Sequence, residues 1–529
     1  MATAARVARD GESGSTVKMR PTLLTLTILA CTLNLAAQTA PTQNAPASQV
    51  EASKPPENGD ALLRKSVVKI SVTQETRSPL TPWKRESPEK FGGSGVVIAP
   101  GRVLTNAHVV EQVSEILVES PQTALPISFE LVAIDPSRDL ALLSTTDAEF
   151  IKNHPPIPLF DGLPKEGTRV TVMGYPMGGE ALSTTSGVIS RIEWAEIGRG
   201  EEDGMRVQVD AAINFGNSGG PAFVDGKVAG LAFSGMDNAV SDNISYLLAT
   251  EEVKRFLDEV AAGTIDGNTV ANLSTQTLEN PALRAKLGVA SDVTGVVVIG
   301  QKGGPLQAWD IITKVNGQTV DNKGQITIEE DRKVVMDCAI GRFVPSDAAK
   351  DHTIDILRDG KPMTVAIPAY SRIHRVIGSY PDGNYPYLMY GPLVFSPLHD
   401  ELLRNTGAWM VFAESPVGAY FSDDRPSNGK QFVAVTSPLL SSPIGRGYEV
   451  MPGQTLKSVN GKTFANFREF VQGLRNLTDE FVVFEFNESN VEAIVLKRSE
   501  IEAATEKLMD SNGIRRQCSK DVRDVWEKE

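Results

Sequence analysis

Residues 210–221 read DAAINFGNSGGP and set one hydroxyl, that of Ser218, among glycines. A nucleophilic serine needs its oxygen on a tight turn, with backbone N–H groups near the oxyanion that it creates. Glycine permits the backbone angles of such a turn and lets a substrate approach the main chain. Glycine, asparagine and serine are also common in ordinary turns. The stretch alone therefore does not separate a nucleophile loop from a simple connection between strands.

Two upstream segments supply the partners that a nucleophilic serine needs. His108 lies in VLTNAHVV (residues 103–110), and Asp139 lies in DPSRDLALL (residues 135–143). Such a serine is activated by a nearby base that a third group orients. The order His, Asp, Ser predicts that His108 takes the proton of Ser218 while Asp139 orients His108. Asp135, in a turn-like setting before Pro136, is the alternative acid.

The motifs TNAHVV, DLALL and DAAIN-GNSGGP together resemble the three signatures of the HtrA/Deg serine proteases. The resemblance implies a chymotrypsin-like double β-barrel with His108, Asp139 and Ser218 as the catalytic triad. It places the oxyanion hole at Gly216, Asn217 and Ser218, chiefly through the N–H groups of Gly216 and Ser218. The S1 substrate pocket would involve Phe215, Ala232, Phe233, Ser234 and Gly235, with Ile244 nearby. Plain barrel core is the alternative interpretation of these last residues.

The 529-residue chain is long enough for about three domains, and its net charge of −14 argues against nucleic acid as a partner. No Cys/His cluster has metal-ligand spacing, and no glycine-rich loop precedes a helix as phosphate binding requires. We therefore expect no cofactor. Cys338 and Cys518 are expected to be free buried thiols, with a disulfide between them as the alternative. The histidines other than His108 are interpreted as surface or structural residues.

The N-terminus predicts export. Lys18 and Arg20 precede an apolar run at residues 23–35, and Ala36-Ala37 follows, which is typical of a cleaved secretory signal over residues 1–37. Met19 is a possible true start, and lipidation at Cys31 is an alternative to cleavage. The location would be periplasmic or otherwise exported. Residues 38–60 are polar and aperiodic and predict a disordered linker.

The remaining chain divides into four parts. Short alternating strands with turn signals, among them Asp225-Gly226, predict a β-barrel protease domain over 61–263, closed by a helix that ends at Gly263. The segment 312–322 matches 456–466 position by position around a shared VNG turn, which indicates a duplicated module. Both copies resemble PDZ domains, set at 265–369 and 370–496, although Trp309 stands where such domains commonly have glycine. The stripe Ile501, Ala504 and Leu508 predicts a helical tail over 497–529.

The two PDZ-like copies are expected to differ in function. Thr294, Gly295, Val296 and Val297 form a glycine turn that opens a strand, which predicts capture of C-terminal peptides by strand addition. The similar stretch of the second copy, residues 390–395, contains Pro392, which has no N–H to donate. A structural or assembly role is therefore expected for the second copy.

Two functions compete. The first is an exported, ATP-independent endopeptidase that degrades unfolded or damaged proteins, and the resemblance implies an oligomer built on trimers. The second is a non-catalytic chaperone or PDZ peptide-binding scaffold that kept the protease fold. The complete His-Asp-Ser set favours the endopeptidase.

Overall fold

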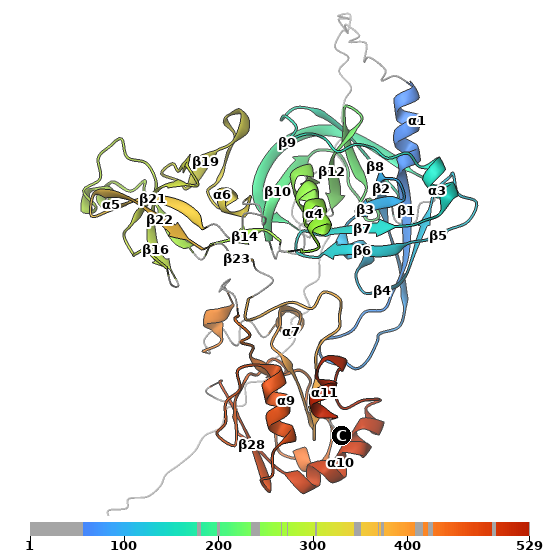
Figure 1. Cartoon of the computed structure of the whole chain (residues 1–529), viewed down its shortest axis with the longest axis vertical. Helices are drawn as coiled ribbons and strands as arrows, with labels where there is room; N and C mark the ends of the chain where they lie inside the picture. The colour runs from blue at the N-terminus through green and yellow to red at the C-terminus, as the bar shows by residue number, and fades with distance from the viewer. Residues whose placement is uncertain are drawn as a thin grey trace, which may run out of the picture. The chain divides into compact units, whose positions relative to one another are not determined.

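A computed structural model describes residues 57–527, except 177–180, 198–201, 234–243, 266, 272, 302–303, 343–350, 369, 372–374, 408–415, 422–426 and 489–492. The fold is mainly β, as the sequence predicts (Figure 1). The proposed signal segment and Cys31 lie outside the described residues. The predicted linker is wrong at its end, because helix α1 (Glu57–Ser66) already begins at residue 57. This helix is anchored where Leu63 enters the core and the Ser66 hydroxyl donates to Pro155 O (2.5 Å).

The first sheet carries the segments that contain His108 and Asp139. Its strand order is β5-β4-β1-β2-β3-β7-β6, with antiparallel neighbours. Ile70 and Val72 of β1 are buried on the same face, as the period-two pattern predicts. The strands are β1 (Val67–Gln74), β2 (Glu89–Ala99), β3 (Arg102–Thr105), β4 (Val113–Glu119), β5 (Ile127–Ser128), β6 (Glu130–Asp135) and β7 (Leu140–Ser144), with helices α2 (Ala107–Val110) and α3 (Ala148–Asn153).

The second sheet closes into a barrel with the order β10-β13-β12-β11-β8-β9. Its strands are β8 (Arg169–Gly174), β9 (Ser183–Ile197), β10 (Glu202–Val209), β11 (Pro221–Val224), β12 (Lys227–Phe233) and β13 (Ser245–Ala249). Asp225 and Gly226 both have positive φ, which is the hairpin geometry that their sequence predicts. Helix α4 (Thr250–Ala262) follows and buries Val253 and Phe256. The left-handed Gly263 ends it, which confirms the predicted stop.

The region that we call PDZ-like domain 1 (residues 265–369) contains a sheet in the order β15-β16-β17-β21-β22. These strands are β15 (Leu273–Thr277), β16 (Val296–Gln301), β17 (Ile311–Val315), β21 (His352–Arg358) and β22 (Lys361–Ile367), and β18 (Gln318–Thr319) pairs with β17. Two smaller pairs join β19 (Gln325–Thr327) to β20 (Lys333–Val335) and β14 (Thr269–Val270) to β23 (Tyr370–Ser371), which directly follows this region. The helices are α5 (Pro281–Lys286), η1 (Glu329–Asp331) and α6 (Cys338–Gly341).

The region that we call PDZ-like domain 2 (residues 370–496) contains two three-stranded sheets, β24-β25-β26 and β27-β28-β29. The strands are β24 (Leu388–Tyr390), β25 (Leu393–Pro397), β26 (Val433–Val435), β27 (Leu456–Val459), β28 (Phe481–Phe486) and β29 (Ile494–Lys497). The helices are α7 (Asp400–Thr406), η4 (Gly418–Tyr420), η5 (Pro443–Gly445) and α9 (Phe467–Arg475). The tail adds α10 (Arg498–Ser511), η6 (Lys520–Val522) and α11 (Arg523–Trp526). The predicted tail helix is confirmed, with Ile501 and Leu508 buried.

The two copies share backbone geometry as well as sequence. Val298 N–H donates to Asp310 O (2.8 Å), and Trp309 N–H donates to Val298 O (2.8 Å). In the second copy Val435 exchanges the matching pair of bonds with Gln454 O (2.9 Å) and Gly453 N–H (2.7 Å). Trp309 has φ +79°, the left-handed region that Gly453 occupies at +96°, which explains why glycine suits this position. Strand β26 therefore corresponds to β16, and β25 corresponds to β15. The predicted match of residues 390–395 with residues 294–297 is therefore wrong, because residues 390–395 belong to β24, β25 and the turn between them.

Candidate active site

His108 is presented by a short helix whose other side chains are buried. Helix α2 follows β3 directly, and Ala107, Val109 and Val110 all enter the core. The His108 side chain keeps about a quarter of its surface exposed. The fold thus fixes the imidazole at the edge of the first sheet.

Asp139 faces this imidazole. It lies in the turn between β6 and β7, and its Oδ1 and Oδ2 atoms are 2.9 and 2.8 Å from His108 Nδ1. Asp139 Oδ1 also accepts the His108 backbone N–H at 3.0 Å. A carboxylate only accepts, so Nδ1 carries the hydrogen, and in the neutral ring Nε2 is left as the basic nitrogen. This is the tautomer that a general base needs.

Asp135, the alternative acid, is bound elsewhere. Its Oδ1 accepts from Ser137 N–H (3.1 Å), from the Ser137 hydroxyl (2.5 Å) and from Arg138 N–H (3.2 Å). Its other oxygen accepts from the Arg138 guanidinium. The structure therefore brings Asp139, rather than Asp135, to His108.

The Ser218 loop packs against the segment that leads into His108. A Cβ on Gly219 would lie 2.2 Å from Ser94 O and 2.3 Å from Thr105 Oγ1, so only glycine fits there. A Cβ on Gly93 would lie 2.7 Å from the methyl groups of Val109 and 3.2 Å from Ser218 O. Gly93 is thus in close contact with the neighbour of His108 and with Ser218 itself.

Ser94 fixes the main chain of this loop, a role that the sequence did not suggest. Its N–H donates to Ser218 O (2.8 Å), and its hydroxyl donates to Gly216 O (2.8 Å). Asn217 N–H donates to Asn214 O (3.0 Å), so this N–H is engaged within the loop. Of the three predicted oxyanion-hole residues, Gly216 and Ser218 thus remain as the candidate donors. Asn106 is a second residue that the sequence did not single out, and its side chain donates to Asp139 O (2.9 Å).

The predicted S1 residues divide into three groups. Phe215 has 66 % of its surface exposed, next to Gly216. Phe233 is buried beside Tyr246, and Ala232 holds the serine loop through hydrogen bonds to Gly219 N–H (2.9 Å) and Gly220 O (2.8 Å). Ser234 and Gly235 lie outside the described residues.

The predicted peptide-binding stretch has no open strand edge. Val296 and Val297 of β16 pair with β15 on one side and with β17 on the other. A peptide strand therefore cannot add there, because both edges are already hydrogen-bonded. Strand β15 is one of the two terminal strands of this sheet, β22 being the other.

Other side chains of the described part of the chain offer no second reaction centre. Cys338 and Cys518 are free and buried, as predicted, and burial raises the pKa of the two thiols to about 12 and about 11. His154, His352 and His399 are buried structural residues, and His374 lies outside the description. The described residues contain no group of His, Cys, Asp and Glu side chains that could hold a metal ion. None of the described helices is long and apolar enough to cross a membrane.

Fold and site together define a trypsin-like serine protease joined to a PDZ domain. Family models match a trypsin-like peptidase domain at residues 93–231 and a PDZ domain at residues 379–521. The chain is 30% identical to Protease Do-like 2, chloroplastic, from Arabidopsis thaliana, and the match covers 90% of this chain and 78% of that protein. It is 27% identical to the putative protease Do-like 3, mitochondrial, of the same plant, over 87% of this chain and 80% of the relative.

Among solved structures, the HtrA-type protease AlgW with a tripeptide matches with a TM-score of 0.46 and 24% identity, over 59% of this chain and 95% of that one. The sequence relatives decide the family. The chain belongs to the Deg/HtrA serine proteases, and it is an enzyme of that type, as its three motifs predict.

Proposed function

We propose that this protease is an ATP-independent endopeptidase that cleaves unfolded or damaged proteins through an acyl-enzyme on Ser218. The observation that carries the proposal is the His108–Asp139 pair, with Nδ1 held by both carboxylate oxygens at 2.8 and 2.9 Å. The serine loop packs onto the segment before His108, which supports Ser218 as the nucleophile.

In the proposed mechanism His108 Nε2 removes the proton of Ser218 Oγ as Oγ attacks the peptide carbonyl. His108 then gives this proton to the leaving amine, which yields an ester on Ser218. A water molecule, deprotonated by His108, attacks the ester, and the proton returns to Ser218 as the acid product leaves. Asp139 keeps the imidazole in place and stabilises its cationic form.

The developing oxyanion is assigned to the N–H groups of Gly216 and Ser218. Losing one such donor typically costs about 3 kcal/mol of transition-state stabilisation. Asn217 would act by shaping the loop, since its own N–H is engaged by Asn214 O. Exposed Phe215 is the proposed contact for substrate beside this hole, whereas buried Phe233 is assigned to barrel packing.

Peptide capture is proposed on β15 of PDZ-like domain 1, in place of residues 294–297. A peptide can add there as a further strand, because β15 pairs only with β16 in the described sheet. In the second copy β24 covers β25, the counterpart of β15, and the tail extends this cover through the Met389 N–H bond to Gln517 O (2.8 Å). A structural role for PDZ-like domain 2 follows from this self-occupied edge.

The proposed location is an exported or organellar compartment, and the proposed assembly is built on trimers. The apolar N-terminal run supports a targeting signal, and the relatives compared above are named chloroplastic and mitochondrial. The proposed limits of the protease domain are residues 57–263. The proposed PDZ-like domains and tail keep the limits 265–369, 370–496 and 497–529.

Digestion of β-casein by the full chain and by Ser218→Ala tests the proposal, with light scattering after size exclusion to give the assembly. Cleavage by the wild-type chain alone is expected, in an oligomer of three subunits or a multiple of three. Casein cleavage by Ser218→Ala would contradict the assigned nucleophile, and a fully active monomer would contradict the assembly.

A further inference from the structure

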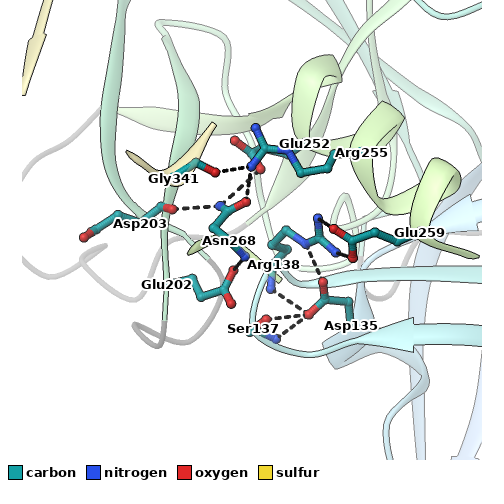
Figure 2. A network of polar contacts seen from close by, with 10 residues as sticks. All are labelled: Asp135, Ser137, Arg138, Glu202, Asp203, Glu252, Arg255, Glu259, Asn268 and Gly341. Atoms are coloured by element: carbon teal, nitrogen blue, oxygen red, sulfur yellow. Dashed lines mark hydrogen bonds and ion pairs between the residues drawn. The ribbon is translucent and has the colours of Figure 1, made fainter. Parts of the chain in front are cut away.

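Asp139 ends a turn whose preceding residues are held by one buried carboxylate. Asp135 binds the N–H groups of Ser137 and Arg138 and also the Arg138 side chain (Figure 2). Side-chain acceptance of N–H groups two and three residues ahead is the way in which aspartate fixes a turn. The chain is thus locked as far as Arg138, one residue before Asp139.

The Arg138 side chain joins this turn to helix α4. None of the side chain is exposed, and its Nη1 atom donates to Glu259 Oε1 at 3.1 Å while Nη2 donates to Oε2. Only 4% of the Glu259 side chain is exposed. Two parallel bonds between a guanidinium and a carboxylate fix orientation as well as distance. The turn is therefore attached to a helix 121 residues further along the chain.

The charges of this cluster hold it together as a unit. Burial alone would lower the pKa of Arg138, but Asp135 and Glu259 outweigh burial and raise the pKa, so the guanidinium stays charged. Glu202 is the next carboxyl group near this charge, and burial and then Asp135 raise its pKa well above its ordinary value. Removal of one partner of such a pair leaves a buried charge uncompensated.

The conformation of Asp139 needs such support. Its φ of +56° is unusual for a residue with a side chain and persists only where the surroundings hold it. On one side Asn106 binds the Asp139 carbonyl at 2.9 Å, and His108 binds its carboxylate. On the other side the chain is fixed by Arg138. The carboxylate reaches His108 because both sides are held.

We propose that Arg138, through its buried pair with Glu259, is a positioning residue that keeps Asp139 aligned with His108. The proposal rests on the proposed triad and deepens it. Arg138 touches no reacting atom, so its removal should misalign the triad while leaving substrate binding unchanged.

The test uses the full chain, an internally quenched peptide substrate and active sites counted with a fluorophosphonate. Glu259→Gln removes the charge but keeps the shape. We expect kcat to fall roughly 10- to 100-fold with KM within about twofold, less than the about 10⁴-fold loss typical when the orienting aspartate is neutralised. The acid limb of kcat/KM should move to lower pH, because a displaced Asp139 stabilises the imidazolium less. Glu259→Asp, which keeps the carboxylate, should retain more activity.

The matched control is Asp310→Asn in PDZ-like domain 1. Asp310 is 1% exposed and is held by two bonds from Arg358, at 2.7 and 2.6 Å. It should lose stability with no change in kcat or in the pH profile. If Glu259→Gln does not fold, Arg138→Lys, which keeps the charge but loses the planar fork, carries the same test with the same expected fall in kcat.

The outcomes separate the two proposals. The positioning role would be overturned if a folded Glu259→Gln or Arg138→Lys chain kept the wild-type kcat and an unshifted acid limb of kcat/KM. The proposed triad would be unaffected by that result. Peptide cleavage by Ser218→Ala would instead overturn the proposed mechanism.

Discussion

Both carboxylate oxygens of Asp139 lie within 2.9 Å of His108 Nδ1, and the backbone N–H of His108 binds the same carboxylate at 3.0 Å. Asp139, the proposed orienting acid, thus binds both the ring and the main chain of the proposed base. Thermal rotation of the imidazole is restrained before any substrate arrives, which is the pre-organisation that proton transfer in a triad requires.

Replacement of the proposed triad residues should give graded losses. We expect Ser218→Ala and His108→Ala each to lower kcat by about 10⁶-fold, because either loss disables the acyl-transfer unit. Asp139→Asn should lose about 10⁴-fold, because its role is orientation. Single-turnover peptide cleavage measures all three. A loss with Asp135→Ala that equals the loss for Ser218→Ala, together with full activity of Asp139→Ala, would show that the acid is misassigned.

Gly219→Ala should damage both activity and stability. The added Cβ would lie 2.2 Å from Ser94 O in a residue with φ +79°. Backbone strain and overpacking together predict a loss of roughly 3 kcal/mol in the free energy of unfolding, with displacement of Ser218. Urea unfolding and fluorophosphonate labelling measure the two effects.

Gly226→Ala is the control for this substitution. Gly226 has φ +75° but no atom within 4 Å of an added Cβ. It should lose only about 1 kcal/mol for the left-handed backbone and keep full labelling. Equal effects at the two glycines would show that contact with Ser94 does not matter.

The pairing of His108 with Asp139 was predictable from the sequence because it depends on short local motifs. TNAHVV places a histidine at the start of a helix, and GNSGG places a serine in a glycine-rich turn. The structure brings these two segments together. Arg138 was not predictable in this way. A charged residue in a polar turn normally indicates a solvent-exposed position, and its partner Glu259 lies 121 residues away.

The wrong prediction of peptide addition at residues 294–297 has a related cause. Strand β15 reads LSTQT, with no apolar alternation that would mark it as a strand, so the pairing of β16 on both edges could not be anticipated. Helix α1 was missed because its sequence ENGDALLRKS is mostly polar, and among its described side chains Leu63 is the apolar one that enters the core. In both cases tertiary contacts, rather than local composition, determine the secondary structure.

The free energy of unfolding should fall as the pH rises through about 8, because of Glu202. Burial, and then Asp135, raise its pKa to about 8 from the ordinary value of 4.5. The stabilising contribution of the protonated form is complete below pH 4.5 and is lost as the pH rises through the folded pKa, by at most about 1.4 kcal/mol per unit. Urea unfolding between pH 6 and pH 9 should show this slope, and Glu202→Gln should flatten it. An identical slope in Glu202→Gln would assign the effect to another group.

Peptides should protect β15 rather than β16. Hydrogen exchange on full-length Ser218→Ala, with and without decapeptides that end in valine or phenylalanine, should slow at residues 273–277, since strand addition uses the open backbone edge. Amidated versions of the same peptides are the control for carboxylate capture and should bind more weakly. Protection confined to residues 388–397 would contradict the self-occupied edge of PDZ-like domain 2.

Activation should not require a newly cut N-terminus. Many chymotrypsin-like enzymes carry an aspartate before the nucleophile that pairs with a new α-ammonium group, but this chain has Asn217 there. Asn217 Oδ1 is buried and has no hydrogen-bond partner among the described residues. Asn217→Asp would therefore place an unpaired charge in the loop, and we expect about 10-fold or greater loss of peptidase activity relative to wild type at neutral pH. This deficit relative to wild type should shrink as the pH is lowered and the carboxyl protonates. Asn214→Asp, an exposed change in the same loop, should have almost no effect on activity.

Deletion of residues 39–56 should leave activity unchanged. Activity that appears only after cleavage of this segment, or that rises in Asn217→Asp, would show that activation does require a new N-terminus.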